Sequence, residues 1–88
     1  MQNRNFMIIN RLGLHARAAA QLVQTANKFN SNVTLIKDDV EVNGKSIMGI
    51  LLLAAPQGTE LAVTVEGLDE QHAMDVIAAL FEDGFGED

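Results

Sequence analysis

The sequence predicts an α+β fold: an open-faced β-sandwich in which three helices cover one face of a four-stranded, largely antiparallel sheet. Two patterns predict it. Apolar residues alternate strictly over 60–66, which is typical of a strand with one face on the core, and they recur at helical spacing in two longer segments. The expected order of elements is βαββαβα. Because the chain has 88 residues, we assign 1–88 to a single domain.

The first two elements are a strand and a helix. The apolar run 6–9 contains β-branched residues and is followed by an asparagine, which predicts a short strand. From Ala16 onward, apolar residues repeat at i, i+3, i+4 and i+7, which predicts an amphipathic helix. We expect Lys28 in its last turn, where a cation complements the helix dipole, and an end at 30–32. The apolar face comprises Ala19, Leu22, Val23 and Ala26.

A hairpin and a short helix follow. Residues 33–37 and 40–42 are predicted strands joined by a tight turn of two aspartates. The Asn-Gly pair at 43–44 signals a further turn. Ser46 is a suitable N-cap for a short helix over 47–53, because its hydroxyl can accept a bond from a free backbone N–H.

The last two elements are a strand over 60–66 and a helix. Leu61, Val63 and Val65 should face the core. Asp69 is expected to cap the helix, and Gly84 to end it. The apolar stripe of this helix comprises Ala73, Val76, Ile77, Leu80 and Phe81.

Composition excludes several classes of function. The chain has no cysteine, which excludes a disulfide scaffold, a thiol nucleophile and a zinc site of the Cys type. A net charge of −6 disfavours nucleic-acid binding, which needs a basic face. The longest apolar stretch, 50–56, is far shorter than the ~20 residues of a membrane span, and no signal peptide is evident. We therefore expect a cytoplasmic monomer without membrane insertion, metal or cofactor.

The segment 13–17 holds the candidate reactive residue. His15 lies at the predicted start of the first helix, where backbone N–H groups have no internal partner and the dipole favours anions. No Ser, Thr, Asp or Asn immediately precedes Ala16, so the backbone donors of Ala16 and Arg17 are expected to be open to a phosphate. The Arg17 side chain adds a permanent, fork-shaped cation that suits phosphate oxygens.

Imidazole chemistry fits this position. Neutral imidazole is a nucleophile, and the ordinary imidazole pKa of ~6.5 leaves much of it neutral near pH 7. A phosphorylated His15 would be held by Arg17 for transfer rather than hydrolysed, because no general base for water is evident. On position alone, however, a histidine at a helix start is more often a cap or a surface residue.

Two motifs make the chain resemble a known family. Leu-Gly-Leu-His-Ala-Arg-Ala-Ala spans 12–19, and Asn-Gly-Lys-Ser-Ile-Met-Gly-Ile spans 43–50. With this separation, and over essentially the whole chain, the sequence resembles the histidine-containing phosphocarrier proteins (HPr) of the bacterial phosphotransferase system.

The resemblance implies that Nδ1 of His15 accepts a phosphoryl group from phosphorylated enzyme I, which itself uses phosphoenolpyruvate. The group then passes to IIA-type proteins or domains, and Arg17 stabilises it. The family's usual motif has proline where this chain has Ala18; both suit the first turn of a helix, so we expect the helix to form. Ala18 and the ending 84–88 resemble the nitrogen-related branch (NPr), whereas the Ser46 segment resembles the sugar-linked branch, and both branches stay open.

Ser46 and the apolar helix after it have a second implied role. The resemblance implies that Ser46 is phosphorylated by a dedicated kinase, and the reverse reaction needs a phosphatase. Ile50 and Leu53 are expected to face the core, while the exposed side of the helix forms a docking patch for partner proteins. The docking candidates are Ile47, Met48 and Leu51.

Two rival functions stand against the carrier. An acylphosphatase-like hydrolase is also a compact α+β domain with an arginine-lined phosphate cradle, but it would release phosphate to water. A ligand-sensing or protein-binding module, in which His15 has no chemistry, has no positive feature in the sequence. We therefore interpret the chain as a phosphoryl-transfer carrier that forms a phosphohistidine, and not as a stand-alone enzyme.

Overall fold

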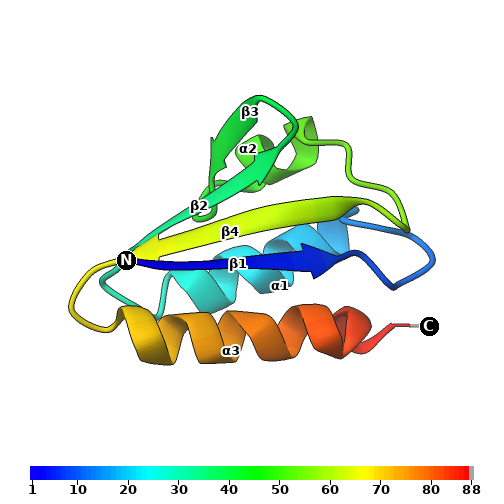
Figure 1. Cartoon of the computed structure of the whole chain (residues 1–88). Helices are drawn as coiled ribbons and strands as arrows, with labels where there is room; N and C mark the ends of the chain where they lie inside the picture. Colours follow the sequence, from blue (N-terminus) through cyan, green and yellow to red (C-terminus); the bar gives the residue numbers. More distant parts are fainter. Residues whose placement is uncertain (88) are drawn as a thin grey trace.

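The computed structural model describes residues 1–87, and it has the predicted open-faced α+β architecture (Figure 1). Four strands form one antiparallel sheet in the order β1-β4-β2-β3. The strands are β1 (Gln2–Met7), β2 (Asn32–Lys37), β3 (Val40–Asn43) and β4 (Glu60–Glu66). The helices are α1 (Ala16–Ala26), α2 (Ile47–Leu52), α3 (Glu70–Glu82) and a short 3₁₀ turn, η1 (Gly84–Gly86). Within residues 1–87, no helix combines the length and apolar character needed to cross a membrane.

The centre of the sheet is β4, which pairs with β1 on one side and β2 on the other. Leu61, Val63 and Val65 are fully buried under the helices, as their alternation predicts. The facing helices contribute Leu22 from α1 and Ile77 from α3, both fully buried. The core is therefore largely aliphatic and lies between the sheet and the helical layer.

Two predicted elements, the strand over 6–9 and the first helix, have different bounds in the structure. The first strand begins at Gln2 and ends at Met7, because its polar first residues pair along the full length of β4, from Gln2 opposite Val65 to Met7 opposite Glu60. The first helix ends at Ala26, so Lys28 lies beyond it and no basic residue occupies its last turn. The chain tightens there, since the N–H groups of Lys28 and Phe29 donate to carbonyls three residues back, those of Thr25 and Ala26.

Asp69 does not cap α3 with its side chain, contrary to the prediction. Its carboxylate instead accepts hydrogen bonds from the backbone N–H of Asn30, at 2.9 Å, and from the backbone N–H and hydroxyl of Ser31. These bonds lower the pKa of Asp69, with the Ser31 hydroxyl as the largest contribution. Asp69 therefore ties the start of α3 to the turn between α1 and β2.

The loop before α1 is held against the turn after α2. Leu14 N donates to the Ala55 carbonyl at 2.9 Å, and Gly13 adopts a positive φ of 71° directly beside it. A Cβ atom on Gly13 would lie 2.5 Å from that same carbonyl oxygen, so only glycine allows this approach. This contact sets the position from which α1 begins.

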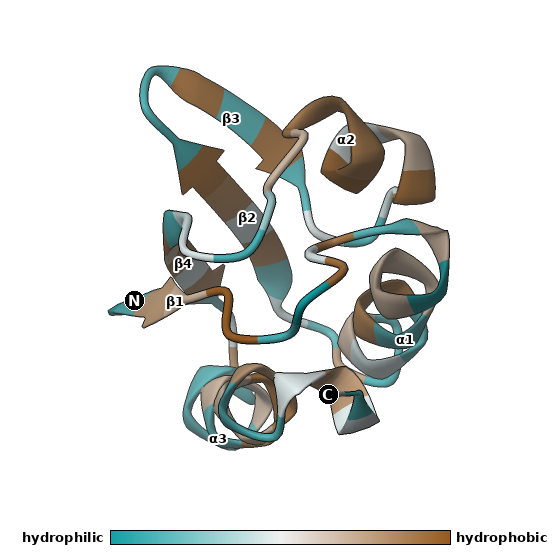
Figure 2. Cartoon of the chain, turned by 90° about the vertical axis from the view of Figure 1, so that its right-hand side faces the viewer, coloured by the Kyte–Doolittle hydropathy of each residue, from teal (hydrophilic) through white to brown (hydrophobic). Residues whose placement is uncertain are grey.

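The C-terminal segment turns back from α3 toward the start of α1 (Figure 2). Gly84 has a φ of 60° and ends the helix, as expected, and Phe85 continues the left-handed turn with a φ of 58°. The Phe85 ring is buried, and its carbonyl accepts a hydrogen bond from the Gln21 amide of α1 at 3.1 Å. Residues 85–87 are thereby held beside α1.

Candidate functional site

His15 is itself the N-cap of α1, so the helix start is not uncapped as the sequence suggested. Its backbone is extended, with φ −79° and ψ −178°, and its Nδ1 accepts a hydrogen bond from the backbone N–H of Arg17 at 3.4 Å. That distance is long for such a bond, so the interaction is weak. The prediction failed because an imidazole can act as a cap although histidine is not among the preferred capping residues.

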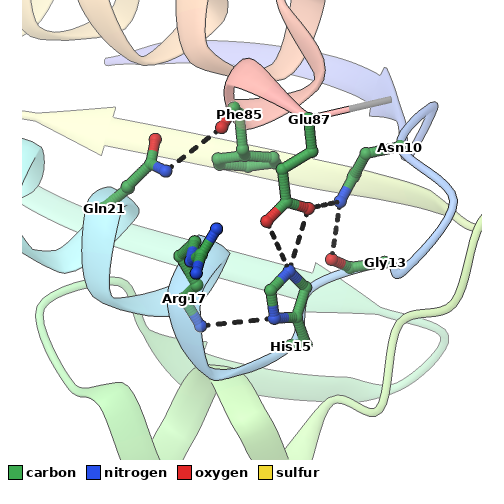
Figure 3. A network of polar contacts seen from close by, with 7 residues as sticks. All are labelled: Asn10, Gly13, His15, Arg17, Gln21, Phe85 and Glu87. Atoms are coloured by element: carbon green, nitrogen blue, oxygen red, sulfur yellow. Dashed lines mark hydrogen bonds and ion pairs between the residues drawn. The ribbon is translucent and has the colours of Figure 1, made fainter.

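The other ring nitrogen of His15 faces the C-terminal segment (Figure 3). Nε2 lies 2.9 and 2.7 Å from the two carboxylate oxygens of Glu87. A carboxylate can only accept a hydrogen bond, and Nδ1 already accepts one from Arg17. The single N–H of a neutral His15 ring is therefore assigned to Nε2, which donates it to Glu87. The lone pair of Nδ1 therefore points at the start of α1.

Asn10 holds the carboxylate in place. Its side-chain amide donates to Glu87 at 2.9 Å and to the Gly13 carbonyl at 2.8 Å, and the residue is only 1% exposed. The pKa of Glu87 is lowered, chiefly by the hydrogen bond from His15, with further contributions from Asn10 and the positive charge of Arg17. Glu87 is consequently a carboxylate at neutral pH.

Arg17 supplies the cation of the site. Its residue is exposed on the first turn of α1, and a shallow pocket of about 290 Å³ is lined by Arg11, Leu12, Arg17, Gly86 and Glu87. Two arginines therefore line this pocket, and Glu87, which contacts His15, lines it as well. Within residues 1–87, no three His, Asp or Glu side chains are grouped as a metal ion requires.

Ser46 caps α2 as predicted. Its backbone is extended, and its Oγ accepts a hydrogen bond from the Gly49 N–H at 3.1 Å. The hydroxyl therefore lies at the first turn of a helix that packs against α1 and β3.

The outer face of α2 is apolar and exposed, as predicted. Ile50 and Leu53 are buried, while Met48 is 71% exposed and both Ile47 and Leu51 are also exposed. Sequence reasoning missed Leu52, which is 74% exposed on the same short helix. We call Ile47, Met48, Leu51 and Leu52 the α2 patch.

Two residues of the site, Asn10 and Glu87, are not predicted by the sequence. Its local pattern marks Asn10 only as the residue that ends a strand, and Glu87 only as part of an acidic C-terminal end. The two positions are separated by 77 residues, and they meet only because Phe85 and the glycines beside it turn the chain back. A signal is present in the Gly-Phe-Gly spacing of 84–86, which predicts a turn anchored by an aromatic ring.

Comparison with known proteins gives the family. The PTS-HPr model, described as "PTS HPr component phosphorylation site", matches residues 2–83. The chain belongs to the HPr family. "Phosphocarrier protein HPr" of Xylella fastidiosa (strain 9a5c) is 53% identical over 88 residues, covering all of this chain and 99% of that protein. "Phosphocarrier protein NPr" of Proteus mirabilis is 44% identical over 88 residues, covering 99% and 98%.

Solved structures of HPr proteins have the same fold. The crystal structure of HPr-C-His from Thermoanaerobacter tengcongensis superposes with a TM-score of 0.96 at 45% identity, covering 100% of this chain and 99% of that one. HPr from Bacillus anthracis superposes with a TM-score of 0.87 at 39% identity, covering 91% of this chain and 95% of that one. A crystal structure of an HPr dimer from Thermoanaerobacter tengcongensis gives 0.79 at 46% identity, covering 99% and 100%.

Proposed function

We propose that this HPr-family chain is a phosphocarrier that accepts a phosphoryl group on Nδ1 of His15 and passes it on. The donor is phosphorylated enzyme I, supplied by phosphoenolpyruvate, and the acceptors are IIA-type proteins or domains. The observation that carries the proposal is the direction of the Nδ1 lone pair, which faces the backbone N–H of Arg17 at the start of α1. A phosphorus atom bound there would meet the donors and the dipole that favour its oxygens.

The weak bond at Nδ1 suits this step. When the lone pair forms the bond to phosphorus, the Arg17 N–H loses its acceptor and becomes available to a phosphoryl oxygen. The first N–H groups of α1, at Ala16 and Arg17, are the backbone donors of the proposed site. The Arg17 side chain is exposed on the same first turn, and its guanidinium is the proposed cation that offsets the charge of these oxygens.

The α2 patch is the proposed docking surface for enzyme I and IIA proteins. Its side chains are exposed and apolar, and the helix that carries them packs against α1, the helix that His15 caps. Met48 can adapt to differently shaped partners, because its side chain is unbranched and polarizable. The docking candidates Ile47, Met48 and Leu51 are thereby joined by Leu52.

Ser46 is the proposed regulatory phosphorylation site for a serine kinase and phosphatase. Its Oγ already caps α2, and phosphate at a helix N-terminus stabilises the helix, so gross refolding is not expected. The added negative charge would lie beside the α2 patch and repel an acidic partner. Comparing transfer rates of wild type and Ser46→Asp tests this, and equal rates with every partner would refute it.

The central experiment is incubation with enzyme I and phosphoenolpyruvate, followed by intact-mass measurement. The mass should rise by one phosphoryl group that is lost in acid, and His15→Ala should show no increase. The phosphoryl group should persist until a IIA protein is added, which separates a carrier from an acylphosphatase-like hydrolase. Rapid release of phosphate to water, or a rise in mass in His15→Ala, would refute the proposal.

The nitrogen-related branch is the second candidate. The HPr relatives of Xylella and Neisseria share 53% and 47% of positions with this chain, against 44% for the NPr of Proteus. This difference favours the HPr branch. Measuring kcat/KM with enzyme I of each branch decides between them, since the chain should be the better substrate of its own donor.

A further inference from the structure

The Glu87 carboxylate contacts the edge of the His15 ring that faces away from the reactive nitrogen (Figure 3). Both carboxylate oxygens lie within hydrogen-bond distance of Nε2, and the Glu87 side chain is only 13% exposed. The His15 side chain is 29% exposed, so the contact is partly shielded from water. The two residues are 72 positions apart in the sequence, so the contact requires other interactions that hold the C-terminal segment against the site.

Three separate contacts hold that segment in place. Asn10, which is 1% exposed, donates to a Glu87 oxygen and to the Gly13 carbonyl, so it joins the C-terminal segment to the loop before His15. Phe85 packs its ring into the core next to Phe81, and Gln21 of α1 donates to the Phe85 carbonyl. Glu87 is thus held from the loop, the core and α1 at once.

We propose that Glu87 is a positioning residue for phosphoryl transfer: its carboxylate accepts the Nε2–H of His15 and so fixes the ring tautomer and orientation that present the Nδ1 lone pair to phosphorus. This inference rests on the proposed phosphocarrier function. Without the carboxylate, the proton of a neutral imidazole can occupy either nitrogen, and the fraction protonated at Nδ1 cannot attack. A carboxylate that orients a ligating or nucleophilic histidine from behind is a general device of such sites.

The same contact keeps the His15 proton on Nε2 while the ring is phosphorylated and while it passes the phosphoryl group on. When Nδ1 attacks, the P–Nδ1 bond forms, the bond from phosphorus to the donor atom breaks, and its electron pair leaves with the donor. The ring becomes a phosphoimidazolium with its proton still on Nε2, and the negative Glu87 pairs with it. In the onward step the P–Nδ1 bond breaks, its electron pair returns to Nδ1, and neutral imidazole remains as the Nε2–H tautomer.

The test combines ring NMR with transfer kinetics on the full chain. Nitrogen-15 signals of His15 should show the Nε2–H tautomer in wild type and a mixture in Glu87→Ala and Glu87→Gln. Phosphorylation by enzyme I and phosphoenolpyruvate should slow about fivefold to tenfold in both variants, as expected for loss of one charge-assisted contact that is not fully buried. Glu87→Asp, which keeps the charge on a shorter stem, should restore part of the rate and of the tautomer preference.

Glu82→Gln is the matched control. Glu82 lies at the C-terminal end of α3, where it makes an exposed pair with Arg4 at 3.5 Å. Its replacement also removes one carboxylate, but it should change neither the ring signals nor the transfer rate. Unchanged ring signals and rates in Glu87→Ala would overturn the role of Glu87 while wild type is still phosphorylated normally. Faster transfer by Glu87→Ala would also overturn it, because the carboxylate would then restrain the ring. If wild type is not phosphorylated at all, the proposed function itself fails.

Discussion

The ring of Phe85 packs edge-on against that of Phe81, with centroids 5.1 Å apart and an interplanar angle of 68°. Phe81 in turn stacks on Phe6 of β1 at 4.7 Å, so three aromatic rings connect the sheet to the end of the chain. Phe85 adopts a φ of 58°, a backbone conformation that costs free energy for any residue except glycine. The buried ring offsets that cost, and the resulting turn directs the next residues toward His15.

Replacing this ring should destabilise the fold. Phe85→Ala keeps the unfavourable φ and leaves a cavity beside Phe81, so the free energy of unfolding should fall by about 3 kcal/mol. In Phe85→Leu the leucine side chain fills part of this cavity, so the free energy of unfolding should fall less than in Phe85→Ala. Urea unfolding of the three proteins measures the difference, and a loss below about 1 kcal/mol for Phe85→Ala would show that the ring is not a core residue.

Gly13→Ala should be more damaging than the same change at Gly58. Both glycines have a positive φ, 71° and 90°, so both variants share the conformational cost of roughly 1–2 kcal/mol. At Gly13 the added Cβ would also lie 2.5 Å from the Ala55 carbonyl, whereas at Gly58 nothing lies within 4 Å. Gly13→Ala should therefore have the lower melting temperature and the slower phosphoryl transfer, since the loop carries His15. Equal melting temperatures would argue against this close approach.

The Asp69 carboxylate should make stability depend on pH in the acid range. Its pKa is lowered in the folded state, first by the Ser31 hydroxyl and then by the Asn30 N–H, so the unfolded chain binds its proton more readily. The stabilisation is complete above the ordinary aspartate pKa of ~3.9 and is lost as pH falls through the lower folded value. The stability gap between wild type and Asp69→Asn should therefore narrow from pH 6 to pH 2.5 in urea titrations. A gap that stays constant would mean that these bonds do not favour the charged form.

Local pattern predicts the elements of this chain but not its long-range contacts. The alternation of β4 and the N-cap at Ser46 are confirmed because each depends on neighbours within a few residues. The start of β1 was missed because polar residues at 2–5 form strand only by pairing with β4. Likewise, Asp69 has capping chemistry, but the backbone of the distant Ser31 competes for its carboxylate.

The candidate site divides along the same line. His15 and Arg17 lie within one motif, and the sequence selects them through that motif and the family resemblance that it carries. Asn10 and Glu87 contribute through a contact between opposite ends of the chain, which requires the turn at Phe85 and the pairing of β1 with the core. No periodicity reports such a contact, because it depends on tertiary structure rather than on neighbouring residues.

Arg17→Ala should slow phosphoryl transfer at least tenfold. The variant removes the proposed charge-assisted contact to the phosphoryl group, and a contact of this kind is typically worth ~1.5–3 kcal/mol. Arg17→Lys keeps the charge but loses the two-pronged geometry, so it should recover only part of the rate. Stopped-flow transfer from enzyme I measures both, with the melting temperature as a check on folding. Wild-type rates in Arg17→Ala would remove the side chain from the mechanism.

An acidic substitution in the α2 patch should weaken partner binding without affecting the fold. Met48 and Leu52 are 71% and 74% exposed, so Met48→Asp and Leu52→Asp should leave the melting temperature nearly unchanged. Burial of an apolar side chain of this size in an interface contributes about 1.5–3 kcal/mol, so KM for enzyme I should rise at least tenfold. Leu68→Asp is the control, because Leu68 is fully exposed in the loop between β4 and α3, at the end of the sheet away from the His15 loop (Figure 1). If Leu68→Asp raised KM as much as Met48→Asp, the effect would come from added negative charge, and the α2 patch would not be the docking surface.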